Sequence, residues 1–171
     1  MKKLVTLAAA FALVASTAQA QTVFTTANPG SVTTYATVTV NTILRLTIND
    51  TSTAILSPTE ADFDAGFQNV GPAVTATVKA NKGYSLSIAG GAATWTGTGG
   101  AQATKPVGNL RWRTAGAAPG TALTTSNVSI ASSASGTGGT ATAVSYDIVW
   151  AYATDTPGIY TIPVVFTAAA P

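Results

Sequence analysis

Three carboxylates close together in the sequence have the clearest potential for chemistry. Glu60, Asp62 and Asp64 lie in a short acidic stretch that ends at Gly66. Calcium takes six or more oxygen ligands, so this stretch is a candidate calcium site, although the ligands that a complete calcium loop needs after Gly66 are missing. The alternative is a solvated turn that tucks Phe63 into the core. A glycosidase pair is a third reading, which requires two carboxyls that face each other across a sugar bond.

The residue types that most enzymes rely on are missing from this chain. It has no histidine and no cysteine. Ser-His-Asp catalysis, thiol catalysis and metal sites built on imidazole or thiolate are therefore excluded. We expect a protein that is not an enzyme and that holds no cofactor.

Tryptophan offers a second kind of site, a stacking surface for carbohydrate. Trp112 and Trp150 fall on the apolar faces of expected strands, where aromatic side chains bury large areas. Trp95 lies between glycine-rich segments and is the tryptophan we expect to be exposed. Trp95 is therefore the candidate contact of a glycan- or cell-wall-binding module, which is the alternative function.

The N-terminus has the layout of a secretory signal peptide over residues 1–20. Lys2 and Lys3 precede a short apolar run, Leu4–Val14, and small residues lead to a cleavage site after Ala20. The run is shorter than the ~20 apolar residues of a spanning helix, so we expect no membrane span in the mature form. The protein is predicted to be exported to the periplasm, the cell surface or the medium of a bacterium.

The composition favours contact with copies of the same chain. Charged residues make up 8% of the chain, against about 25% in ordinary domains. Without Lys2 and Lys3, six basic residues (8 − 2) balance six acidic ones, so the mature net charge is zero. No basic stripe is present to bind nucleic acid, and weak self-repulsion favours self-association.

Alternation of apolar and polar residues predicts an all-β fold over residues 35–171. The clearest run is Tyr35 to Ile48, whose even positions are mostly apolar and whose odd positions are mostly polar. Residues 74–78 and 84–88 predict a hairpin closed by a turn at 81–83. Pro163 places the last strand at a sheet edge or at a bulge. About seven to eight strands in one domain indicate an immunoglobulin-like antiparallel β-sandwich.

Residues 21–34 form an N-terminal extension that is short, rich in hydroxyl side chains and cut off by Pro29-Gly30. Val23, Phe24 and Thr25 are its candidate strand. This strand either folds back as an edge strand or pairs with an edge of a neighbouring copy, which is β-strand addition.

The closing turn and strand, Asp155-Thr156-Pro157-Gly158-Ile159-Tyr160-Thr161, resemble the closing hairpin of bacterial exported surface subunits. The fimbrial and spore-coat-U-like proteins are subunits of this kind, and they share the signal peptide and the Thr-rich alternating strands. The resemblance implies a structural protein of the cell surface, a fimbrium or pilus subunit, with no catalytic residues.

Overall fold

The computed structural model describes residues 35–49, 55–102 and 104–171, so the predicted signal peptide and the Val23–Thr25 strand lie outside the described residues. The chain divides after Thr39 into two units, and every described helix and strand belongs to the second unit. The described elements are β1 (Leu44–Ile48), α1 (Glu60–Ala65), β2 (Phe67–Ala80), β3 (Tyr84–Gly90), β4 (Thr96–Thr98), the 3₁₀ turn η1 (Val107–Asn109), β5 (Leu110–Arg113), β6 (Thr121–Ala122), β7 (Val128–Ser133), β8 (Thr137–Val149), β9 (Ile159–Thr161) and β10 (Val164–Ala169).

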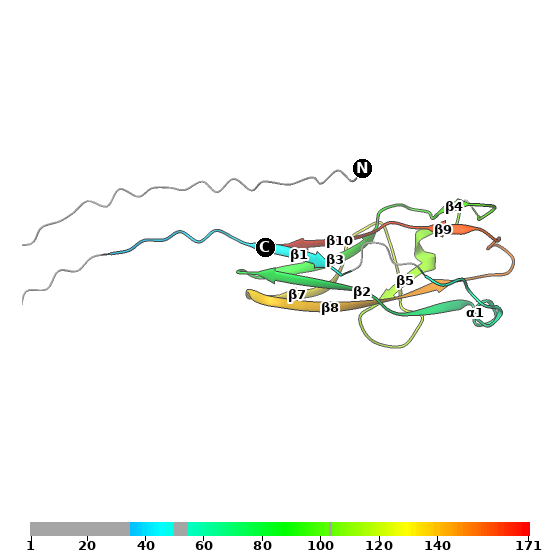
Figure 1. Cartoon of the computed structure of the whole chain (residues 1–171), viewed down its shortest axis with the longest axis horizontal. Coiled ribbons are helices and arrows are strands. Elements are labelled where there is room, and N and C mark those ends of the chain that lie inside the picture. Colours follow the sequence, from blue (N-terminus) through cyan, green and yellow to red (C-terminus); the bar gives the residue numbers. More distant parts are fainter. Residues whose placement is uncertain (1–34, 50–54, 103) are drawn as a thin grey trace, which may run out of the picture. The chain divides into compact units, whose positions relative to one another are not determined.

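These strands form antiparallel sheets that pack face to face, which confirms the prediction of an all-β sandwich (Figure 1). One sheet has the order β1-β2-β8-β5-β6, the second has the order β10-β3-β7, and β4 pairs with β9 in a small third sheet. The structure describes ten strands, more than the seven to eight expected, because short segments such as β4 and β6 also pair. The immunoglobulin-like strand order stays a prediction.

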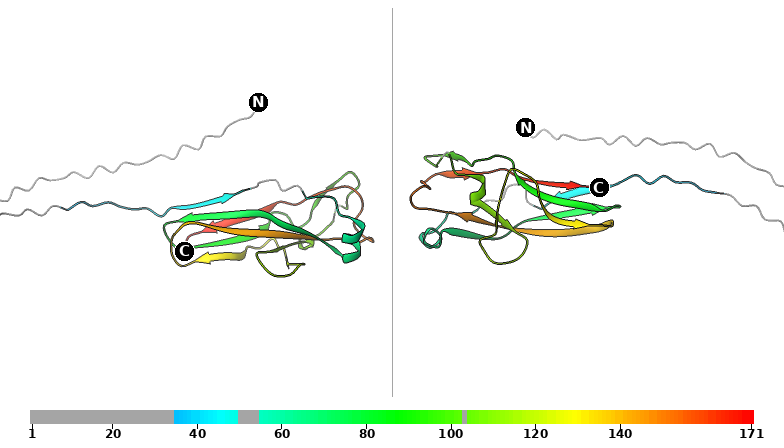
Figure 2. Two further views of the ribbon diagram at one scale, coloured as in Figure 1. Left: turned by 60° about the horizontal axis from the view of Figure 1, so that its bottom comes forward. Right: turned by 180° about the vertical axis from the view of Figure 1, so that it is seen from behind.

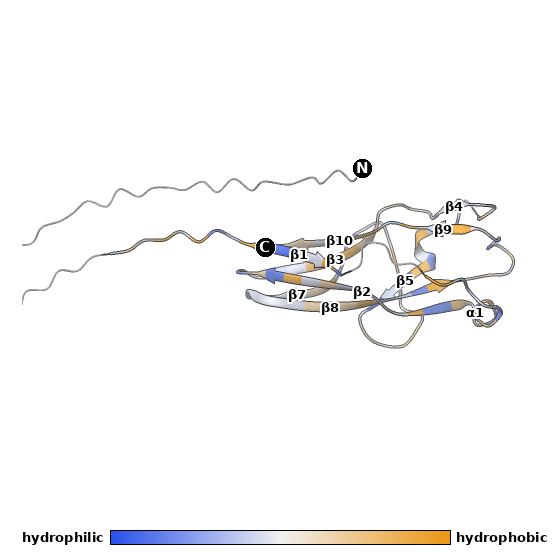
Figure 3. Cartoon of the chain, in the orientation of Figure 1, coloured by the Kyte–Doolittle hydropathy of each residue, from blue (hydrophilic) through white to orange (hydrophobic). Residues whose placement is uncertain are grey.

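The apolar residues of the two main sheets meet in the interior and form two buried clusters. One lies between β2 and β3 and centres on Val78 and Leu86. The other is larger, contains Trp112, Tyr146 and Trp150, and lies further along β8. Along β2 and β8 apolar residues are interspersed with hydrophilic ones, which is the alternation that places one face inside (Figure 3).

The predicted hairpin between residues 74–78 and 84–88 is wrong. Both strands form, but β2 belongs to the first sheet and β3 to the second, so the turn at 81–83 crosses from one layer to the other. An alternating pattern says which side chains are buried and not which strand supplies the hydrogen bonds. Gly83 suits this crossing, since a Cβ there would lie 2.8 Å from the carbonyl oxygen of Ala134.

The long strand predicted over Tyr35 to Ile48 is correct only in its second half. β1 covers Leu44 to Ile48, and residues 35–43 have no strand assignment. The reason lies in the partner strand. Leu44 pairs with Ala80, the last residue of β2, and the chain then turns away to β3. No residue of β2 is left to pair with the segment that precedes Leu44.

The expectation for Pro163 is confirmed. The final strand is interrupted at Ile162 and Pro163, which separate β9 from β10, and β10 is an edge strand with β3 as its one partner among the described strands. β10 and β1 lie beside each other at one side of the sandwich (Figures 1 and 2). β1 is an edge strand of the first sheet and β10 is an edge strand of the second, so an edge of each main sheet lies on this side.

Candidate functional site: an apolar groove

The acidic stretch forms a helix cap and not a metal-binding loop. α1 begins after Thr59, whose hydroxyl oxygen accepts a hydrogen bond from the Asp62 backbone N–H, while the Asp62 carboxylate accepts from the Thr59 backbone N–H at 2.8 Å. The Thr59 backbone N–H, together with the Thr59 hydroxyl that donates to the same carboxylate at 2.7 Å, stabilises the ionised form and lowers the pKa of Asp62. Gly66 ends the helix with a φ of 75°, a conformation that favours glycine.

The remaining carboxylates of this stretch do not converge either. Asp64 accepts a hydrogen bond from the Tyr152 hydroxyl at 3.1 Å. Across the described residues, no group of three or more His, Cys, Asp or Glu side chains lies close enough to hold a metal ion. The calcium hypothesis for Glu60, Asp62 and Asp64 therefore has no support from the geometry.

The expectation that Trp95 is exposed is wrong. Its side chain is 5% exposed and packs edge-on against Tyr160, with ring centroids 6.5 Å apart. The flanking glycines let the backbone run close to neighbouring segments instead of lifting the indole into solvent. Trp112 and Trp150 are buried, as expected.

An apolar groove of about 830 Å³ opens between the first sheet and the β9–β10 segment. Its floor is the inner face of the first sheet. One side is the stretch from Gly158 to Val164 with Phe166, and the other is the end of β1 with residues 55–58. The described lining consists of Ile48, Ile55, Leu56, Ser57, Pro58, Val74, Trp95, Leu110, Tyr146, Ile148, Trp150, Gly158, Ile159, Tyr160, Thr161, Ile162, Pro163, Val164 and Phe166.

The chemistry of this groove is that of a binding surface for an apolar chain. None of the described lining residues is charged, and most of them present aliphatic or aromatic side chains. Tyr146 lies on the floor, and its burial raises its pKa to about 12, so its hydroxyl stays neutral near neutral pH. β9 and β10, which both contribute to the lining, each have one hydrogen-bonded neighbour among the described strands.

A buried ion pair holds the β9 side of the groove in place. The Lys105 ammonium is fully buried and lies 2.6 Å from Asp155 Oδ1. It also donates to the carbonyl oxygen of Val149 at 2.7 Å and lies 4.3 Å from the centre of the Trp150 ring. The second oxygen of Asp155 accepts from the Ala151 N–H at 2.8 Å. This pair therefore ties the end of β8 and the turn before β9 to the segment that precedes β5.

Sequence patterns do not predict the Lys105–Asp155 pair, because fifty residues separate the two and no local pattern links them. Asp155 was expected only as part of a turn. The turn is present, and its Gly158 packs so closely against Ala101 that a Cβ at this position would clash. The motif Asp155 to Gly158 thus does two things: it turns the chain and it supplies the buried carboxylate.

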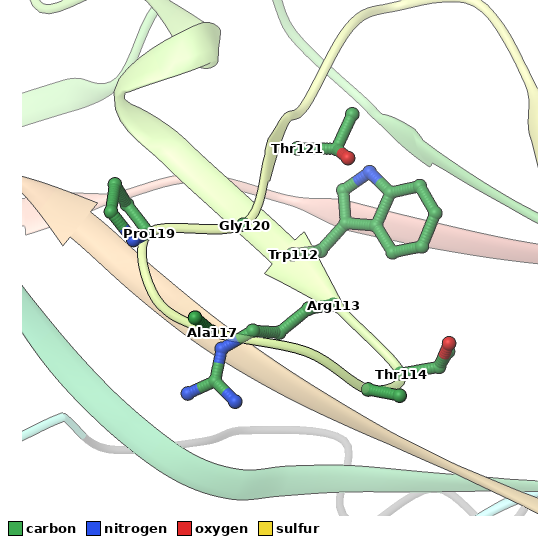
Figure 4. A pocket seen from close by; sticks show the side chains of 8 residues that line it. Trp112, Arg113, Thr114, Ala117, Pro119, Gly120 and Thr121 are labelled. Carbon is green, nitrogen blue, oxygen red and sulfur yellow. The ribbon is translucent and has the colours of Figure 1, made fainter.

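A second ion pair lies on the opposite face of the first sheet. Asp147 is fully buried and receives hydrogen bonds from Arg113 Nε at 3.1 Å and from the Gly120 N–H at 2.8 Å. Arg113 is therefore paired within the chain, although its place on the outer face of β5 is typical of a solvated strand charge. The loop from Thr114 to Gly120 curves here around a shallow hollow of about 420 Å³ (Figure 4). The ion pair pins this loop to β8, which is a structural role.

The segment before β1 is the second notable surface. Residues 35–43 are exposed throughout, and Val38 and Val40 are 83% and 72% exposed. The backbone on the β1 side of this segment is held by Asn81, which accepts from the Ile43 N–H at 2.8 Å and donates to the Asn41 carbonyl oxygen at 2.7 Å. Apolar side chains at alternate positions therefore remain without a covering surface in the described part of the chain.

These features define the class of the molecule: an antiparallel β-sandwich with an uncharged apolar groove at one side. No protein-family model, no curated protein and no solved structure matches this chain. Among the described residues, no helix is both long enough and apolar enough to cross a membrane.

Proposed function

We propose that this chain is an exported, non-enzymatic structural subunit of a bacterial cell surface, and that it assembles with identical subunits into a filament or pilus by β-strand addition. The observation that carries the proposal is the apolar groove, which is lined in part by β9 and β10, strands with a single hydrogen-bonded neighbour each among the described strands. Strand addition uses an unpaired backbone edge together with apolar pockets for alternate side chains, and these two features support the proposal.

Two further observations support this role. The chain has few charged residues. The electrostatic repulsion between two copies is therefore weaker than the repulsion between two ordinary soluble domains. The two buried ion pairs of the described residues join segments of the same sandwich. Each is explained by folding and does not need a substrate.

The alternative, a glycan- or cell-wall-binding module, rested on an exposed Trp95. That side chain is buried, and no other described tryptophan is exposed. No observation therefore favours the glycan-binding function over the structural one.

The test is to express the full chain in a bacterial host, recover it from the cell envelope and the medium, and examine it by electron microscopy and analytical ultracentrifugation. We expect a mature N-terminus at Gln21 and regular assemblies that dissociate to single subunits on denaturation. A protein that stays in the cytoplasm, or one that remains a monomer at every concentration tested, would show the proposal to be wrong.

A further inference from the structure

We propose that the Tyr35–Ile43 segment of one copy is the strand that occupies the apolar groove of a second copy. This inference rests on the proposed function and names both contact surfaces: the donor segment Tyr35–Ile43 and the groove between the first sheet and β9–β10. The predicted strand of Val23, Phe24 and Thr25 lies outside the described residues and stays a separate prediction.

The first argument is that residues 35–40 of the donor segment have the pattern of a buried strand but pair with none of the described strands. Ala36, Val38 and Val40 continue the alternation of β1, and all three are exposed. The same period in β1 places Leu44, Leu46 and Ile48 partly inside. Because β2 ends at the residue that pairs with Leu44, the donor segment needs a strand from another source.

The second argument is chemical complementarity. The inward face of the donor segment would present one small and two branched apolar side chains, Ala36, Val38 and Val40, followed by Thr42. The groove has an uncharged apolar lining into which such side chains fit. The opposite face of the segment has Thr37, Thr39 and Asn41, which suits a strand that is wet on its outer side.

The third argument is length. A strand rises about 3.3 Å per residue, so the three inward side chains from Ala36 to Val40 span roughly 13 Å. The wall from Gly158 to Val164 is seven residues long and runs about 20 Å if extended. The groove wall is therefore longer than the apolar face of the donor segment.

The fourth argument concerns which copy supplies the strand. The donor segment joins β1 at Leu44, whereas the groove is lined by Ile48 at the opposite end of β1. Asn81 holds Asn41 and Ile43 through two side-chain hydrogen bonds, and its own N–H donates to the Ile43 carbonyl oxygen at 3.2 Å. A neighbouring copy meets no such obstacle, so we assign the occupant to a second copy.

The absence of cysteine from the sequence permits a direct test by disulfide trapping. Val38→Cys and Ile159→Cys variants of the full chain are exported separately, mixed under assembling conditions and oxidised mildly. Ile159 is an exposed residue of the groove wall, so neither change should disturb folding. We expect a 38–159 disulfide between chains, identified by mass spectrometry, in several-fold higher yield than a 37–159 disulfide from the matched Thr37→Cys variant.

A second, independent measurement uses charge. The double variant Val38→Asp/Val40→Asp should assemble at least about tenfold more weakly, because a carboxylate is costly to bury in an apolar groove. The matched control, Thr37→Asp/Thr39→Asp, adds the same charge to the outward face and should assemble with a smaller loss. All four positions are exposed, so both variants should melt like the unmodified subunit.

The outcomes separate this inference from the proposed function. If the protein assembles but position 38 cross-links to the groove no better than position 37 does, the donor assignment is wrong and the structural role stands. If a chain with both cysteines closes the disulfide within a single monomer, its own segment fills the groove and the inference is wrong. If no assembly occurs under any condition, the proposed function fails and the inference with it.

Discussion

The two ends of the sandwich are built on different principles. At the end where β2 leads into β3, the sheets close on a compact apolar cluster around Val78 and Leu86, which has no buried charge among its described members. The other end holds the larger apolar cluster and the groove that borders it, and the segment that forms the groove wall is tied down by the buried Lys105–Asp155 pair. Apolar packing alone therefore holds the first end, whereas a directional ion pair is added at the second.

The largest predicted effect would break that tether. Asp155→Ala leaves the Lys105 ammonium fully buried without its carboxylate, and we expect a loss of about 3–5 kcal/mol in the free energy of unfolding. Chemical denaturation measures this loss. The matched control is the double variant Lys105→Met/Asp155→Leu, which removes both charges and should cost much less. If Asp155→Ala lowers the free energy of unfolding no more than the double variant does, the ion pair does not hold the groove wall in place.

A somewhat smaller effect tests how tightly the two ends of the sandwich are packed. Leu86→Ala removes a fully buried side chain from the closed end, and we expect a loss of about 2–5 kcal/mol. Ile162→Ala, in the partly buried groove wall, should cost about 1–2 kcal/mol, since its side chain already borders open space. Denaturation of the isolated subunit compares the two. Equal losses would mean that the groove end is packed as tightly as the closed end.

The smallest effect follows from Tyr146 on the groove floor, whose pKa burial raises to about 12 from an ordinary value near 10. The folded state then favours the neutral phenol, so its contribution to stability is fully present below about pH 10. It is lost as the pH rises from 10 to 12, with a slope of up to about 1.4 kcal/mol per pH unit. Denaturation at several alkaline pH values measures this decline. Tyr146→Phe should make the decline shallower, and an unchanged slope would contradict the assignment.

Much of the fold was predictable because burial follows a period of two residues. Val144, Tyr146, Ile148 and Trp150 stand at alternate positions of the sequence, and all four side chains are buried. Tyr152 continues the same alternation but is exposed, because β8 ends at Val149 and the chain turns. The short helix after Thr59 was also predictable, since a capping threonine acts on the residues that follow it directly.

The candidate site was less predictable for the same physical reason. Its parts are far apart in the sequence: the groove takes residues from β1, β8, β9 and β10, and the Lys105–Asp155 pair joins positions fifty residues apart. Glycines flank Trp95 in the sequence, but the burial of its indole depends on contacts such as that with Tyr160, which is distant in the sequence. β2 and β3 follow each other in the sequence but lie in different sheets, because strand pairing depends on all the strands of a sheet.

The sequence by itself determined the strands, the turns between them and which side chains must leave water, because these depend on neighbouring residues and on a local period. The tertiary structure alone decided which strand pairs with which, where the sandwich stays open and which charges meet inside it. Those choices depend on contacts between distant segments, and here they leave Ala36, Val38 and Val40 without a partner among the described strands.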